Sequence, residues 1–210
     1  MINSIFVHLN RLDLPNLWTT VTTYFWVFGL FFLTVWILCT KNSNEKETIY
    51  FLPFCLSMIV GLTLLIVLGL TLLTVKGLIL TSILLYASLS DWKTRSVSNY
   101  VAIMIFILSL VGFEAANLPS MLIGAALVFI PQFTLAIVQP NRACGGADLK
   151  ISTALAFLLG AQRGVFALIV GMLLAIVFMT IYNRINAKDS KEAFPLIPFL
   201  SVGAMLAYIV

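Results

Sequence analysis

The chain alternates between long apolar runs and short polar interruptions. A helix that crosses a membrane needs roughly 20 mainly apolar residues. Residues 17–40 satisfy this length and predict one span, followed by a polar loop at 41–47. Residues 48–90 are too many for a single crossing and predict two spans, with a turn between Gly69 and Gly77.

The second half continues the pattern with shorter segments. Residues 91–99 predict a loop, 161–164 a turn and 183–193 a charged connection. The apolar segments between them predict five further spans, at 100–112, 121–138, 151–160, 165–182 and 194–210. We therefore expect an all-α polytopic membrane bundle of about eight transmembrane helices. An N-terminal membrane segment of two helices (1–70) would precede a six-helix core (71–210).

Composition excludes several classes of function. Hydrophobic residues make up 61% of the chain and charged residues 10%, with a mean hydropathy of +1.09, so the chain's surroundings are membrane lipid. No basic patch is interleaved with aromatic residues, so we expect no nucleic-acid partner. The three cysteines lack a C-x-x-C pair, and one histidine cannot supply an H-E-x-x-H zinc motif. We accordingly expect no metal and no cofactor.

The basic residues predict an orientation. If the spans are divided as above, three basic residues, Arg11, Lys76 and Arg163, lie on one side of the membrane. The other nine lie on the opposite side: Lys41, Lys46, Lys93, Arg95, Arg142, Lys150, Arg184, Lys188 and Lys191. Cytoplasmic loops are enriched in Lys and Arg, which places this second side in the cytoplasm.

Two aspartates lie on that side, each at the end of a membrane-type segment. Asp91 closes one apolar run, and Asp148 follows Gly145 and Gly146 at the start of another. The two spans between them return the chain to the side it left, so the carboxylates can meet. Ionisable groups at the edge of hydrocarbon are candidates for function. Two carboxylates that share a site favour a state with one proton, which is the acid/base pair of aspartic proteolysis.

Three sequence blocks, covering about residues 71–210, resemble the type IV prepilin peptidases among the G-x-G-D membrane aspartyl proteases. The blocks are Asp91…Thr94-Arg95-x-Val97-x-Asn99 (compare D-x-x-T-x-x-I-P-N), Gly145-Gly146-Ala147-Asp148-Leu149-Lys150 (compare G-x-G-D-x-K), and Phe194 to Ala204 (compare I-P-F-x-P-F-L-x-x-G-A). The chain departs from the pattern twice. Ala147 stands where a second glycine is usual, and Ser98 where proline is usual.

The resemblance implies a membrane aspartic endopeptidase in the cytoplasmic membrane of a prokaryotic cell. Its substrates would be prepilins or pseudopilins, whose short basic leader is cut at the cytoplasmic face. Asp91 and Asp148 would be catalytic. The residues implied to bind substrate or shape the loops are Thr94, Arg95, Asn99, Gly145, Gly146, Lys150, Pro195 and Pro198. The cysteine-rich insert of methylating members is missing, since only residues 41–47 occupy its place.

Two other functions remain open from the sequence. A proton-coupled membrane transporter could also use carboxylates at the membrane edge. The carboxylates lie at helix ends and no inverted repeat is evident, which argues against it. A catalytically inactive subunit of a pilus or secretion assembly is the third interpretation, and retention of both aspartates argues against that one.

Overall fold

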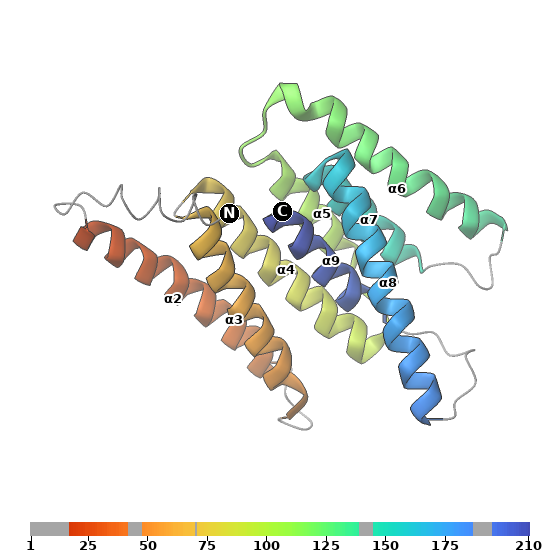
Figure 1. Cartoon of the computed structure of the whole chain (residues 1–210), viewed down its shortest axis with the longest axis horizontal. Coiled ribbons are helices and arrows are strands. Elements are labelled where there is room, and N and C mark those ends of the chain that lie inside the picture. The colour runs from red at the N-terminus through yellow and green to blue at the C-terminus, as the bar shows by residue number, and fades with distance from the viewer. Residues whose placement is uncertain (1–16, 42–47, 70, 139–144, 187–194) are drawn as a thin grey trace. The chain divides into compact units, whose positions relative to one another are not determined.

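The computed structural model describes residues 17–41, 48–69, 71–138, 145–186 and 195–210. Regular structure in these ranges is helical throughout, which confirms the predicted all-α class (Figure 1). The elements are α2 (Leu17–Lys41), α3 (Thr48–Leu68), α4 (Leu72–Thr94), α5 (Asn99–Leu110), the short 3₁₀ helix η2 (Ala115–Asn117), α6 (Leu118–Val138), α7 (Gly146–Leu159), α8 (Ala161–Asn186) and α9 (Ile197–Ile209).

Three segments of the described chain are long and apolar enough to cross a membrane. They are Leu72–Thr94, Ala115–Val138 and Ala161–Tyr182. A helical membrane bundle fits these segments, and the number of about eight spans stays a prediction. The predicted division of the chain near residue 70 also stays a prediction.

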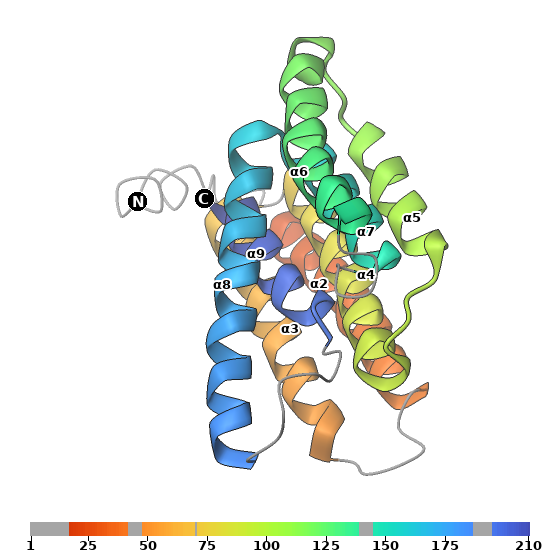
Figure 2. The same cartoon turned by 90° about the vertical axis from the view of Figure 1, so that its right-hand side faces the viewer.

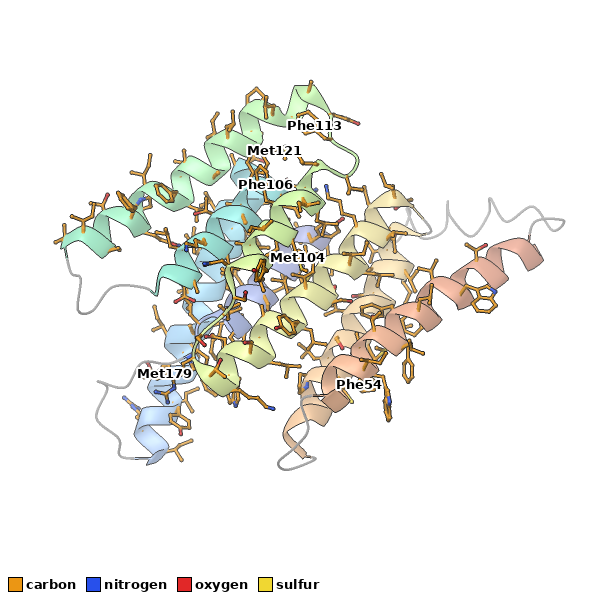
Figure 3. All side chains as sticks on the ribbon, turned by 180° about the vertical axis from the view of Figure 1, so that it is seen from behind. Phe54, Met104, Phe106, Phe113, Met121 and Met179 are labelled. Atoms are coloured by element: carbon orange, nitrogen blue, oxygen red, sulfur yellow. The ribbon has the colours of Figure 1, made fainter. Side chains whose placement is uncertain are left out.

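The chain forms two compact units, Met1–Ser82 and Ile83–Val210. In the first unit α2 runs beside α3 (Figure 1). An added Cβ at Gly61 would overlap the ring of Phe31, so the missing side chain lets that ring pack against α3. Phe54 of α3, labelled in Figure 3, meets Phe32 and Trp36 edge to face, with ring centroids 5.5 and 5.9 Å away. Aromatic packing therefore joins these two helices.

In the second unit α7 packs on four neighbours: α5, α6, α8 and α9 (Figures 1 and 2). Its residues Ile151 and Leu155 are each 1% exposed. The ring of Phe157 stacks on Phe106 of α5, labelled in Figure 3, with centroids 5.0 Å apart. Although α7 is short, it is surrounded by protein, and this buried helix carries Asp148 in its first turn.

The turn between α3 and α4 lies at the N-terminal end of the predicted interval. Helix α3 ends at Leu68, and Gly69 has φ +64°, a left-handed conformation that glycine adopts without steric cost. Helix α4 begins at Leu72, so Gly77 is helical.

The predicted turn at 161–164 is wrong. Gly160, with φ +81°, reverses the chain by itself, and α8 begins at Ala161. The N–H of Ala161, at the start of α8, donates to Ser120 Oγ at 3.2 Å. Ser120 belongs to α6, so a side chain of that helix caps the start of α8. Gly164 is a helical packing position, because an added Cβ there would lie 2.7 Å from the Cα of Ala156.

The predicted loop at 91–99 is also shorter than expected. Helix α4 continues to Thr94, so Asp91 belongs to its last turn. Lys93 lies in the same turn, where a cation is favoured by the negative end of the helix dipole. The helix stops where Arg95 takes φ +50°.

Candidate active site

Asp91 is buried and bonded to the start of another helix. Its side chain is only 6% exposed, and its Oδ2 accepts a hydrogen bond of 3.1 Å from the backbone N–H of Ile197. Ile197 is the first residue of α9, where N–H groups lack partners within the helix. The positive end of the α9 dipole therefore faces this carboxylate.

The two prolines of the third sequence block flank this donor. Pro198 is in the first turn of α9, where a residue without an N–H costs the helix nothing. Pro195 lies two residues before Ile197. The block thus meets Asp91 through a backbone N–H, and the prolines restrict the backbone on both sides of it.

Asp148 begins α7 and bonds to its own segment. It is the third residue of the helix, and its Oδ2 accepts the N–H of Gly145 at 3.2 Å. An added Cβ on Gly145 would lie 3.2 Å from the same oxygen, so a side chain there would crowd the carboxylate. Gly146 has open space where a Cβ would be. The two glycines are therefore not equivalent.

The negative charge of Asp91 acts on Asp148. Asp148 lies outside the three candidate spans, and its pKa is raised to about 6. Burial is the main cause and the negative charge of Asp91 the second, while the hydrogen bond from Gly145 acts in the opposite direction. The two carboxylates are therefore close enough for the charge of Asp91 to act on Asp148.

Lys150 and Asn99 join the two motifs. Lys150 Nζ, in the first turns of α7, donates to Asn99 Oδ1 at the start of α5 over 2.9 Å. Both groups are exposed. The contact ties the segment after Asp91 to the segment that carries Asp148.

Hydroxyl groups organise the chain between α4 and α5. Thr94 Oγ1 lies 2.9 Å from the carbonyl of Ser90 and 3.0 Å from that of Ser96. Ser90 Oγ donates to the same Ser96 carbonyl at 3.1 Å. Thr94 therefore closes the loop on α4, and the neighbouring Arg95 contributes the left-handed turn.

Ser98 caps a helix at the position where the resemblance leads us to expect proline. It is the N-cap of α5, and its Oγ accepts the N–H of Tyr100 at 3.4 Å. Serine is among the preferred N-cap residues. A side-chain cap therefore stabilises the start of α5, where a proline would instead restrict the backbone through its ring.

One group of the site has no sequence signal. The N–H of Ile197 is a backbone donor, so nothing about the isoleucine side chain marks it. Only its position directly before Pro198, at an expected helix start, could have indicated it. Across the described residues, no group of three His, Cys, Asp or Glu side chains is placed to hold a metal ion.

A comparison with protein families matches residues 78–181 to the type IV leader peptidase family. The chain belongs to this family. The matched region of this leader peptidase family member contains Asp91, Asn99, Asp148 and Lys150. Its membership implies a protease, and together with the three apolar segments it indicates a membrane protein. Neither a curated protein nor a solved structure matches the chain.

Proposed function

We propose that the chain is an aspartic endopeptidase that removes the leader peptide of prepilins or prepilin-like proteins, with Asp91 and Asp148 as its catalytic pair. The observation that carries this proposal is the effect of the Asp91 charge on the pKa of Asp148. A carboxyl group whose ionisation is made more costly by a neighbouring carboxylate keeps its proton to higher pH, and a pair with one proton is the state that aspartic proteolysis requires.

The surroundings of the two groups support different roles. Asp91 accepts a buried N–H from Ile197, and such a bond is strongest to an ionised carboxylate. We assign Asp91 as the base that takes a proton from the attacking water. Asp148, with a pKa of about 6, is the group that holds the shared proton. We assign it as the acid that protonates the scissile carbonyl oxygen.

The proton balance then closes over two steps. Water adds to the carbonyl carbon, its proton passes to Asp91, and the proton of Asp148 passes to the carbonyl oxygen, giving a neutral diol. In the second step Asp91 returns its proton to the leaving nitrogen while the C–N bond breaks. Asp148 regains a proton from the diol hydroxyl. The pair ends in its starting state and needs no cofactor.

The proposed location is the cytoplasmic face of a prokaryotic cytoplasmic membrane. Nine of the twelve basic residues fall on the aspartate side of the predicted topology. Among the described ones, Lys93 and Arg95 follow Asp91, and Lys150 follows Asp148. A substrate with a hydrophobic helix and a short basic leader would keep its leader on that side, because basic segments next to a span stay in the cytoplasm. Because residues 41–47 offer no cysteine cluster, we propose a peptidase without the methylating activity.

Cleavage of a model prepilin tests this function. The purified chain in detergent micelles is mixed with a prepilin that carries a basic leader ending in glycine, and the product mass is measured. We expect a single cut after that glycine. A proton-coupled transporter or an inactive assembly subunit would leave the substrate at its full mass.

A further inference from the structure

Gln132 and Ser152 form a buried hydrogen bond between α6 and α7. Ser152 Oγ donates to Gln132 Oε1 at 2.8 Å, and the two residues are 3% and 4% exposed, respectively. Gln132 lies in one of the three candidate spans, among apolar residues. Polar side chains are costly at membrane depth unless they find a partner. Neither residue belongs to the three motif blocks.

The hydroxyl of Ser152 has two acceptors within reach, and Gln132 Oε1 is the nearer one. A hydroxyl has one proton to donate. The alternative acceptor for Ser152 is the carbonyl of Leu149, 3.1 Å away. That carbonyl already accepts the hydroxyl of Thr153 at 2.7 Å. The shorter contact of Ser152 is therefore the one that leaves its own helix.

The bond lies one helical turn from Asp148. Ser152 follows Asp148 by four residues, and residues with this spacing share one face of a helix. Asp91 is held to a neighbouring helix by its own carboxylate, through the N–H of Ile197. Asp148 bonds to Gly145 of its own segment, so its position depends on how α7 itself is held.

Two contacts fix α7 against α6. At the C-terminal end of α7, a Cβ on Gly124 of α6 would lie 2.7 Å from the carbonyl carbon of Gly160, so the two backbones are in close contact there. Gln132, two turns further along α6, meets Ser152, two turns back along α7. This is the relation of two antiparallel helices. The small-residue contact brings the two helix backbones close together, and the hydrogen bond joins the helices one helical turn from the carboxylate.

We propose that Gln132 and Ser152 are positioning residues for Asp148, and that their hydrogen bond holds the first turn of α7 at the rotation in which Asp148 faces Asp91. The proposal rests on the proposed function, since its effect is read from peptide cleavage. It assigns these residues no contact with the substrate.

Three variants test the bond. Gln132→Met keeps a similar volume without the acceptor, Ser152→Ala removes the donor, and the double variant removes both. Misplacing a reacting group by a fraction of an ångström lowers kcat more than KM, so we expect each single variant to lose about tenfold in kcat with KM within about twofold. The double variant should lose no more than the singles, because both remove one interaction.

Two further variants separate positioning from a general loss of structure. Ser152→Thr keeps the donor and should retain most of kcat. Thr134→Val is the matched control on α6, because the Thr134 hydroxyl is exposed and bonds only along its own helix, to the carbonyl of Ile130 at 2.7 Å. It should leave kcat unchanged. If Gln132→Met fails to accumulate, Ser152→Ala against Ser152→Thr decides the question.

The outcomes for the two proposals differ. If the unmodified chain does not cleave the model prepilin, the proposed function fails. If it cleaves, and Ser152→Ala or Gln132→Met cleaves with the same kcat, the positioning role is wrong while the proposed function stands. Additive losses in the double variant would also overturn the role, because they would show that the two side chains act separately.

Discussion

Asp148, in the first turn of α7, has its pKa raised to about 6, first by burial and second by the negative charge of Asp91 in the last turn of α4. The two effects keep a proton on the pair at a pH where an ordinary exposed aspartate has lost it. The following predictions depend on this relationship and on the contacts around it.

The pH dependence of stability should carry the signature of Asp148. Its pKa in the folded protein lies above the ordinary value of 3.8, so the folded state binds this proton more tightly than the unfolded state does. The resulting stability is full below the ordinary pKa and is lost as the pH rises through about 6. Asp148→Asn removes this titration.

The melting temperature of the unmodified chain should therefore fall relative to that of Asp148→Asn between about pH 4 and about pH 7. Glu114→Gln serves as the control, because Glu114 is an exposed carboxylate far from the pair in sequence and bonds to Asn117 at 3.3 Å. A difference between Asp148→Asn and the unmodified chain that stays constant with pH would contradict the raised pKa.

The two glycines before Asp148 should differ in their tolerance of alanine. In Gly145→Ala the new Cβ would lie 3.2 Å from Asp148 Oδ2, so the carboxylate must move, and we expect kcat to fall about tenfold. Gly146→Ala adds a methyl group in open space within the first turn of α7 and should cleave normally. Steady-state cleavage by the two variants measures this. Equal kcat values would show that close approach to Asp148 is not what requires Gly145.

The bond between Lys150 and Asn99 should act as a unit. Lys150→Met and Asn99→Leu each remove one partner, so each should lower cleavage by a few-fold, as expected for an exposed hydrogen bond. The double variant should be no slower than the slower single variant. Lys93→Met is the matched control, since it removes an exposed basic residue from the same side of the predicted topology. Additive losses would mean that the two residues contribute separately.

The orientation can be measured with single cysteines in a cysteine-free background. Ser96, in the loop after α4, and Asn117, in η2, are both exposed. Ser96→Cys should resist a membrane-impermeant thiol reagent in intact cells, and Asn117→Cys should react with it. Permeabilised cells, in which both sites should react, provide the control. The opposite pattern would place the aspartates outside the cell and exclude cleavage at the cytoplasmic face.

The helices could be predicted because short polar interruptions separate the apolar runs. The prediction that Asp91 and Asp148 can meet came from counting the two spans between them. The ends of helices were harder to predict, because local hydrogen bonds decide them. The polarity of Asp91 indicated a loop, yet α4 continues until Thr94 and Ser96 close it.

The conformation of single residues and the contacts of backbone groups could not be predicted from the sequence. The turn before α8 needs only Gly160, because a left-handed φ reverses the chain within one position. The donor to Asp91 is a main-chain N–H, so the identity of Ile197 carries no signal. The partner of Gln132 depends on the register of α6 against α7, which periodicity does not determine. In the sequence this glutamine is visible only as a polar residue within the apolar run 121–138.

The central claim is that Asp91 and Asp148 act as one catalytic pair, and the most direct measurement is cleavage of a model prepilin by their asparagine variants. Asp91→Asn and Asp148→Asn should each abolish cleavage while the protein still inserts and accumulates. The double variant should be no worse than either single, because residues that act as a unit are not additive. Glu114→Gln should cleave like the unmodified chain. Full turnover by either single variant would contradict the mechanism.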